Sequence, residues 1–146
     1  MRDSGEELEE RVGYVLKRAT AALRAELDDT LRRHGLTMAQ YACLELLDQR
    51  PELSNAELAR GAFVTRQSMN TVLRGLVDAG LVRRPESAPH GRARPARLTR
   101  DGRARLAAAD GEVAAVERRL TAGMSPERRA ALLDDLRVMA RNLAAG

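Results

Sequence analysis

The fold of this chain is decided by residues 54–84, which read SNAELARGAFVTRQSMNTVLRGLVDAGLVRR. After Thr65, apolar residues recur at i, i+3, i+4, i+7 and i+8, the spacing that puts side chains on one face of an α-helix. These apolar residues are Met69, Val72, Leu73, Leu76 and Val77. Gly80 then supplies the left-handed stop that commonly follows a helix. We therefore predict a helix from just after Thr65 to about Ala79, with one buried and one polar face.

A shorter helix is expected immediately before it. Ser54 and Glu57 fit the capping box, in which two side chains satisfy the free backbone groups at a helix start, and this predicts a helix over 55–61. Gly61 opens a short link that ends at Val64. Two helices joined in this way form the helix-turn-helix pattern. The alternative is an ordinary helical hairpin with a polar face.

The polar face of the second helix has the side chains that read bases in a major groove. Arginine can bind guanine O6 and N7, glutamine and asparagine can bind adenine N6 and N7, and hydroxyls can reach bases or phosphates. We predict that DNA is contacted by Thr65, Arg66, Gln67, Ser68, Asn70, Thr71 and Arg74. No acidic residue interrupts this face before Asp78.

Basic residues are concentrated just downstream. Residues 81–105 contain eight arginines and two carboxylates, a net +6, while the whole chain carries only +4. Strand-like runs at 81–84 and 96–99 flank a loop from Pro85 to Pro95, which predicts a β-hairpin. A local basic patch is expected where a protein meets phosphate, although a solvated arginine-rich loop would look the same. The predicted DNA contacts of this region are Arg83, Arg84, His90, Arg92, Arg94 and Arg97.

Long amphipathic helices lie on both sides of this region. The pattern predicts one helix from Glu6 to about Arg33, ended by His34-Gly35, and another over 38–49 capped by Thr37 and Gln40. Two more follow Thr99 and Ser125. The expected fold class is mainly α with a small β-hairpin. A domain of this size cannot bury all these apolar stripes, so we predict a homodimer. The alternative is that the stripes pack on one another within the monomer.

The composition excludes several other classes of protein. Cys43 is the only cysteine, so neither an intrachain disulfide nor a cysteine-based zinc cluster is possible. His34 and His90 are far apart, and no catalytic constellation or phosphate loop can be assembled, so we expect no enzyme, metal or cofactor. No apolar run is long enough for a membrane span, and we expect a soluble cytoplasmic protein.

The chain resembles the MarR family of bacterial regulators over nearly its whole length. The matching stretches are GLTMAQYACLELL from Gly35, the run from Leu53 to Arg84, and RLTRDG from Arg97. The resemblance implies a dimeric winged helix-turn-helix protein, with the DNA-binding region at 36–100 and helical dimerisation regions at 4–34 and 101–146. Residues 85–95 would be a wing that enters the minor groove. Where many family wings end in Asp-Arg-Arg, this chain has His90-Gly91-Arg92.

Some members of this family respond to small phenolic ligands or to oxidants. By resemblance, an effector would bind where the first helix meets the second and the post-wing helix, near Met38, Tyr41 and Cys43. The alternative is that these three residues are simply part of the hydrophobic core. Cys43 lies in the second helix, whereas the redox cysteines of the family typically lie in the first, which argues against oxidant sensing here.

The sequence thus predicts a sequence-specific, double-stranded DNA-binding transcriptional regulator, acting as a ligand-responsive homodimeric repressor on a pseudo-palindromic operator. Half-sites would lie about 10 bp apart. Two alternatives stay open at this point. One is a helical dimerisation module that binds a protein partner, and the other is a nonspecific architectural DNA binder that uses phosphate contacts alone.

Overall fold

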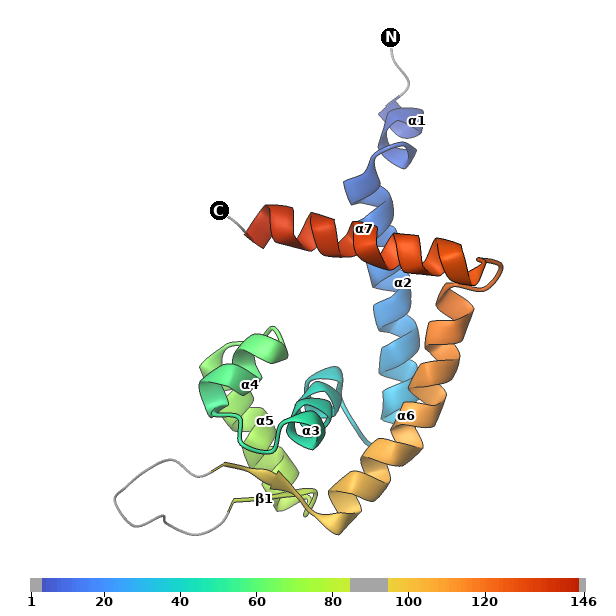
Figure 1. Ribbon diagram of the computed structural model, residues 1–146. Coiled ribbons are helices and arrows are strands. Elements are labelled where there is room, and N and C mark those ends of the chain that lie inside the picture. Colours follow the sequence, from blue (N-terminus) through green and yellow to red (C-terminus); the bar gives the residue numbers. More distant parts are fainter. Residues whose placement is uncertain (1–3, 85–94, 145–146) are drawn as a thin grey trace.

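The computed structural model describes residues 4–84 and 95–144, and the side chains from residue 7 onward within these ranges. It is a helical protein with one short hairpin (Figure 1). In chain order the elements are α1 (Ser4–Glu9), α2 (Val12–Arg32), α3 (Met38–Gln49), α4 (Asn55–Gly61), α5 (Arg66–Asp78), β1 (Val82–Arg83), β2 (Arg97–Leu98), α6 (Arg100–Leu120) and α7 (Pro126–Ala144). The predicted fold class is confirmed.

Local side-chain caps set the helix starts where the sequence predicted them. Thr37 with Gln40, and Ser54 with Glu57, form complete capping boxes at the starts of α3 and α4. Thr65 and Thr99 cap α5 and α6, each accepting a backbone N–H from three residues ahead. Such a cap contributes about 1 kcal/mol, and it also fixes where the helix begins.

The predicted single helix from Glu6 to Arg33 is wrong in one respect. The helix is interrupted between α1 and α2, where Arg11 has an extended backbone with φ −87° and ψ 124°. The apolar residues on either side of the break, Leu8 and Val12, are exposed in the single chain. Most helical stability comes from packing of an apolar face, and within the described residues Leu8 and Val12 have no such packing to keep the helix continuous.

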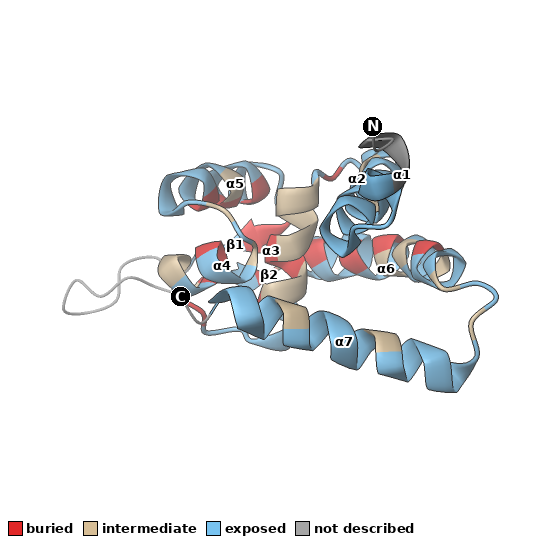
Figure 2. Cartoon of the chain, turned by 90° about the horizontal axis from the view of Figure 1, so that it is seen from above, coloured by how far each residue is buried: buried red, intermediate tan, exposed pale blue. Residues whose placement is uncertain are grey.

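The core lies where α3, α4, α5, the hairpin and the start of α6 meet (Figure 2). Every one of these elements contributes buried side chains, among them Leu44, Leu58, Met69, Leu73, Leu76, Val82, Leu98 and Leu106. Leu31, at the end of α2, also belongs to this core. The core therefore fixes α5 by one face and leaves its opposite face free.

The hairpin is shorter than predicted. β1 and β2 are antiparallel and two residues long, with Val82 opposite Leu98 and Arg83 opposite Arg97. Val82 and Leu98 are buried, and the two arginines are exposed. Successive residues of a strand point to opposite faces, so the arginine pair stands on the solvent side of the hairpin.

The remaining helices extend away from this core. α2 and α6 run side by side, with a 3.0 Å ion pair between Glu26 and Arg119. α7 turns back after α6, and none of its residues is buried (Figures 1 and 2). In the described ranges no helix combines the length and apolar character that crossing a bilayer requires.

Candidate DNA-binding interface

One face of α5 presents polar side chains to solvent. Met69, Leu73 and Leu76 are buried beneath it. The seven residues predicted to read DNA are all exposed: Thr65, Arg66, Gln67, Ser68, Asn70, Thr71 and Arg74. The predicted division of the helix is confirmed except at Val77, whose side chain is exposed rather than buried. Val77 follows the last turn of core contacts, beside a hollow that separates α5 from the end of β1.

Two of these polar residues also hold the start of α5. The backbone N–H of Ser68 donates to Thr65 Oγ1 at 3.0 Å, and the two hydroxyl oxygens are 3.0 Å apart. Thr65 and Ser68 are therefore used in part by the helix itself. Within the described part of the chain, no hydrogen bond is made by the side chains of Arg66, Gln67 and Arg74. These side chains are therefore available for base contacts.

A hydrogen-bonded chain of three side chains joins α4, α5 and Arg84, the residue after β1. Arg84 Nη2 donates to Asn55 Oδ1, and Asn55 Nδ2 donates to Asn70 Oδ1, both at 2.5 Å. Asn70, Arg74 and Arg84 line a hollow of about 530 Å³ with Asn55. Sequence reasoning assigned Asn70 and Arg84 but missed Asn55, which links them. This chain fixes the relative positions of a predicted base contact and a predicted phosphate contact.

The hairpin places two guanidinium groups directly opposite each other. Arg83 and Arg97 are Cα partners in the sheet, and both are exposed. Like charges at directly opposed positions destabilise a hairpin unless an anion lies between them. No ion pair joins either arginine to a carboxylate among the described residues. This pair is therefore suited to bind an external anion such as a phosphate.

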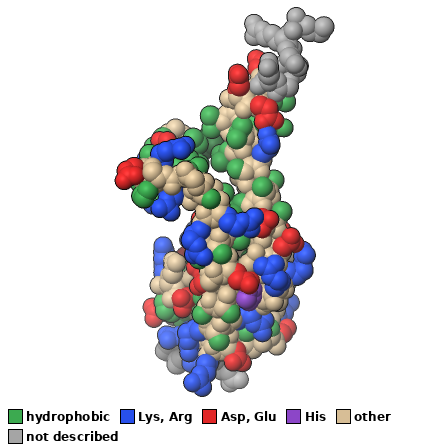
Figure 3. Space-filling model, turned by 90° about the vertical axis from the view of Figure 1, so that its right-hand side faces the viewer, with side chains coloured by type: hydrophobic (Ala, Val, Ile, Leu, Met, Phe, Trp, Pro, Cys, Tyr) green, Lys and Arg blue, Asp and Glu red, His purple; other side chains and the backbone are tan. Residues whose placement is uncertain are grey.

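Lys and Arg side chains, with Asp and Glu among them, are exposed over the lower part of the face in Figure 3. Apolar side chains are more evident over its upper part. The predicted wing contacts His90, Arg92 and Arg94 lie outside the described residues.

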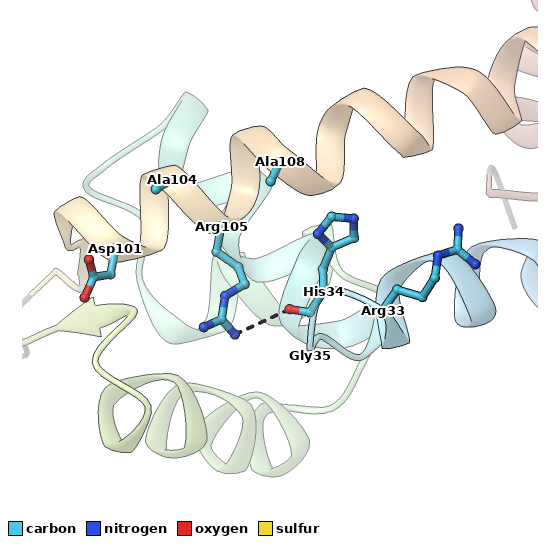
Figure 4. Close-up of a pocket in the computed structure, with 7 residues that line it drawn as sticks. All are labelled: Arg33, His34, Gly35, Asp101, Ala104, Arg105 and Ala108. Carbon is cyan, nitrogen blue, oxygen red and sulfur yellow. Dashed lines mark hydrogen bonds between the residues drawn. The ribbon is translucent and has the colours of Figure 1, made fainter.

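A second feature is a hollow of about 640 Å³ at the junction of α2 and α6 (Figure 4). It is lined by Arg33, His34, Gly35, Asp101, Ala104, Arg105 and Ala108. Arg105 Nη1 donates to the backbone oxygen of His34 at 3.4 Å, which ties α6 to the end of α2. His34 Nε2 is 2.6 Å from Glu112 Oε2, and this hydrogen bond lowers the pKa of Glu112, with help from Arg33.

The three residues predicted to bind an effector, Met38, Tyr41 and Cys43, belong to α3 and are not among the residues that line this hollow. Cys43 is fully buried, and burial raises the pKa of its thiol to about 12. A thiol of this kind is inert, because the thiolate is the reactive form. Met38 and Tyr41 are half-buried against the core, and Tyr41 Oη donates to Asp110 Oδ1 at 2.5 Å.

The comparisons with known proteins agree with this geometry. Residues 34–93 match the model of the MarR family. The HTH-type transcriptional repressor Rv2887 of Mycobacterium tuberculosis is 49% identical to this chain over 119 residues, which cover 81% of this chain and 86% of the relative. The chain belongs to the MarR family. The named relatives of this MarR protein are transcriptional regulators.

Solved structures of MarR regulators share the fold. Rv2887 in complex with DNA has a TM-score of 0.73 and 42% identity, covering 88% of this chain and 97% of that one. The repressor CouR bound to a 23-mer DNA duplex has a TM-score of 0.84 and 34% identity, covering 96% and 99%. Rv2887 in complex with salicylic acid has a TM-score of 0.72 and 44% identity, covering 88% and 96%.

A carboxyl pair between α3 and α6 gives this MarR chain a pH-dependent contact. The pKa of Glu45 is raised from 4.5 to about 7, first by a hydrogen bond with Asp110 and then by burial. A hydrogen bond with Tyr41 opposes this rise in part, and the charges of Asp110 and Asp48 add to it. The pKa of Tyr41 is also raised, by burial and by its bond to Asp110. Because the fold favours the protonated form of Glu45, its contribution to stability is complete below pH 4.5 and is lost as pH rises towards 7.

We expect Glu45→Gln to remove this pH dependence. The free energy of unfolding of the wild type, relative to the variant, should decline between pH 5 and pH 8, because the amide mimics a carboxyl group that stays protonated. Urea denaturation at fixed protein concentration across this range measures the difference. Glu52→Gln, which changes an exposed glutamate outside the cluster, is the control and should parallel the wild type. A constant wild-type to Glu45→Gln difference would contradict the assignment.

Proposed function

We propose that this chain binds a specific double-stranded DNA operator as a homodimer and represses transcription in the cytoplasm. The observation that carries the proposal is the exposed polar face of α5, which adjoins the opposed arginines of the hairpin. In a winged helix-turn-helix dimer, two such helices enter successive major grooves about 10 bp apart. Arg66, Gln67, Asn70 and Arg74 would contact bases, while Arg83, Arg84 and Arg97 would contact phosphates. The wing residues His90, Arg92 and Arg94 would add minor-groove contacts.

The test is selection of operators from random duplex DNA at about 0.15 M salt, followed by comparison with scrambled duplex, because specific binders typically gain 10³-fold or more. An enriched inverted repeat is expected. Weak binding without sequence preference would instead support an architectural DNA binder, and no binding would support a module for a protein partner.

Two kinds of substitution should then behave differently. Gln67→Ala or Arg74→Ala is expected to lower affinity for the selected operator by about 5- to 150-fold and to relax the preference at one base pair, because a bidentate base contact discriminates by about 1–3 kcal/mol. Arg97→Ala should weaken binding to all sequences alike and reduce the salt slope by about 1. Fluorescence anisotropy from 50 to 200 mM salt distinguishes them. Equal effects on operator and scrambled DNA from Arg74→Ala would contradict its base-reading role.

We also propose that an aromatic carboxylate is the effector. Rv2887 is described in complex with salicylic acid and with p-aminosalicylic acid. In this chain the hollow between α2 and α6 is lined by Arg33 and Arg105, whose guanidinium groups would bind a carboxylate, while Met38 and Tyr41 lie on α3, outside this lining. Cys43, being fully buried, would only support α3.

Occupation of the hollow would shift α6 relative to α2 and so change the separation of the two DNA-reading helices. Salicylate titrated into the protein–operator complex should release the DNA from the wild type, and Arg105→Ala should need a higher concentration. Release at the same concentration from both proteins would place the effector elsewhere.

A further inference from the structure

The turn between α4 and α5 ends α4 in a Schellman motif. The backbone N–H of Val64 donates to the Ala59 oxygen at 3.0 Å, and that of Phe63 donates to the Arg60 oxygen at 3.3 Å. This motif requires a left-handed residue after the helix, usually glycine, because a Cβ atom is strained there. Phe63 occupies the position, with φ +59°.

The same chain uses glycine at its two other ends of this type. Gly35, with φ +68°, lies between Leu31 and Leu36, whose backbone groups are hydrogen bonded at 3.0 Å. Gly80, with φ +75°, lies between Leu76 and Leu81, which are bonded in the same way at 3.0 Å. Within the described ranges, Phe63 alone among the residues with positive φ is not a glycine. A phenylalanine thus occupies a backbone position at which a side chain is unfavourable.

Packing does not explain the choice of phenylalanine. Its side chain is 94% exposed, the most of any large apolar residue described. The core contacts of the turn are made by its neighbours Ala62 and Val64. The exposed ring therefore stabilises neither the turn nor the core, and a bulky residue at a strained backbone position motivates the hypothesis of a contact outside the monomer.

The position of the turn indicates what that contact is. Phe63 comes two residues before Thr65, the N-cap of α5, and N-terminal residues of a recognition helix are those that approach base edges. Exposed guanidinium groups lie on both sides in the chain, at Arg60 and Arg66. An exposed aromatic ring with an arginine three residues away on each side in the sequence suits a duplex better than an apolar protein surface. The apolar feature of a major groove is the C5-methyl group of thymine, with which phenylalanine can pack.

We propose that Phe63 reads a thymine in each half-site of the operator through contact with its C5-methyl group. The inference rests on the proposed function, since it adds one apolar contact to the polar face of α5. The proposal predicts that Phe63 contributes to sequence preference through an uncharged contact, in addition to the phosphate contacts proposed for the arginines.

The experiment combines a protein change with a DNA change. After selection of an operator, deoxyuridine replaces thymidine one position at a time, symmetrically in both half-sites, and affinity is measured for wild type, Phe63→Gly and Phe63→Asn. At one position, the wild type should lose about fourfold for each methyl group removed, the value of one buried methyl. Both variants should bind the thymidine operator more weakly, and the uridine replacement should cost them nothing further at that position.

Two further readouts separate a base contact from other roles. The salt slope of Phe63→Gly should equal that of the wild type, because a methyl contact releases no counterions. Its melting temperature should be no lower, because glycine relieves the positive φ. The Phe63→Asn variant is the control for a loss of affinity caused by the extra backbone freedom of glycine, because asparagine tolerates the left-handed region.

The outcomes are distinguishable. If no operator is enriched, the proposed function fails. If an operator is enriched but uridine replacement affects wild type and variants alike at every position, the function stands and the role of Phe63 is overturned. A reduced salt slope in Phe63→Gly would also overturn it, since the residue would then act on phosphate contacts.

Discussion

Replacement of Gly102 by alanine is expected to destabilise the fold by about 3 kcal/mol or more, because the added atom has no space. Gly102 is buried in the first turn of α6, and a Cβ atom there would be 2.0 Å from the backbone oxygen of Leu81 and 3.0 Å from its carbonyl carbon. Both clashes are with backbone, so no side-chain rotation can relieve them. Either α6 or the end of α5 must move.

The clash also falls at a junction of functional importance. The Leu81 oxygen accepts the Thr99 N–H at 3.0 Å, and Thr99 Oγ1 donates to the Gly80 oxygen at 2.6 Å. These bonds join Gly80 and Leu81, which follow α5, to the N-terminal cap of α6. We therefore expect Gly102→Ala to weaken operator binding even under conditions in which the protein remains folded.

Gly111→Ala is the matched control on the same helix. A Cβ atom at Gly111 meets nothing within 4 Å, so the substitution should stabilise the protein by about 0.5–1 kcal/mol through helix propensity. Urea denaturation of both variants at one protein concentration gives the comparison, with concentration fixed because dimer stability depends on it. If Gly102→Ala unfolds at the wild-type midpoint, the close approach of α6 to Leu81 is absent in solution.

The features that the sequence predicts best are those decided within one helical turn. The capping boxes of Thr37 and Ser54 and the stop at Gly80 depend on residues three or four positions apart, and all are found as predicted. The two faces of α5 follow from helical periodicity. Val77 is the one exception, because it has the spacing of the apolar face but lies beyond the core and is exposed. Sequence periodicity also predicts a helix through Arg11, where the structure has a break, because periodicity does not show whether a face has a partner.

Contacts between distant residues could not be predicted in this way. Asn55 connects Asn70 and Arg84, which are 15 and 29 residues away, and nothing in the spacing of these residues marks it. The bond between Tyr41 and Asp110 spans 69 residues. The left-handed backbone of Phe63 had one available signal, namely that it occupies the place after α4 where glycine usually stands.

These distant contacts have a common role in placing α5. Gly102 and Thr99 join the end of α5 to α6, and Asn55 joins its middle to α4 and β1. Tyr41 then joins α3 to α6 further along the same helix. The recognition helix is thus fixed to α6, which in turn runs along α2. We therefore expect that a change between α2 and α6, at the hollow of Arg33 and Arg105, alters the position of the proposed DNA-reading face.

Leu136→Glu is expected to disrupt the dimer and to lower operator affinity by about 100-fold or more, because linked binding of two half-sites raises affinity by 10²–10⁴. α7 has no buried residue in the single chain, and its apolar stripe is exposed. Two further members of the stripe are Leu133, 48% exposed, and Leu143, 88% exposed. A symmetric interface repeats each of these contacts, so one glutamate introduces two buried charges.

Val138→Glu provides a control in which the same charge is added to the same helix. Val138 is 44% exposed, similar to Leu136 at 36%, but it lies two residues along, on the opposite face of α7. It should remain dimeric and bind the operator as the wild type does. Sedimentation equilibrium gives the oligomeric state, and anisotropy gives the affinity. A Leu136→Glu protein that stays dimeric would exclude this face of α7 from the interface, whereas a monomer that retains full operator affinity would show that DNA binding does not need the two-fold pairing.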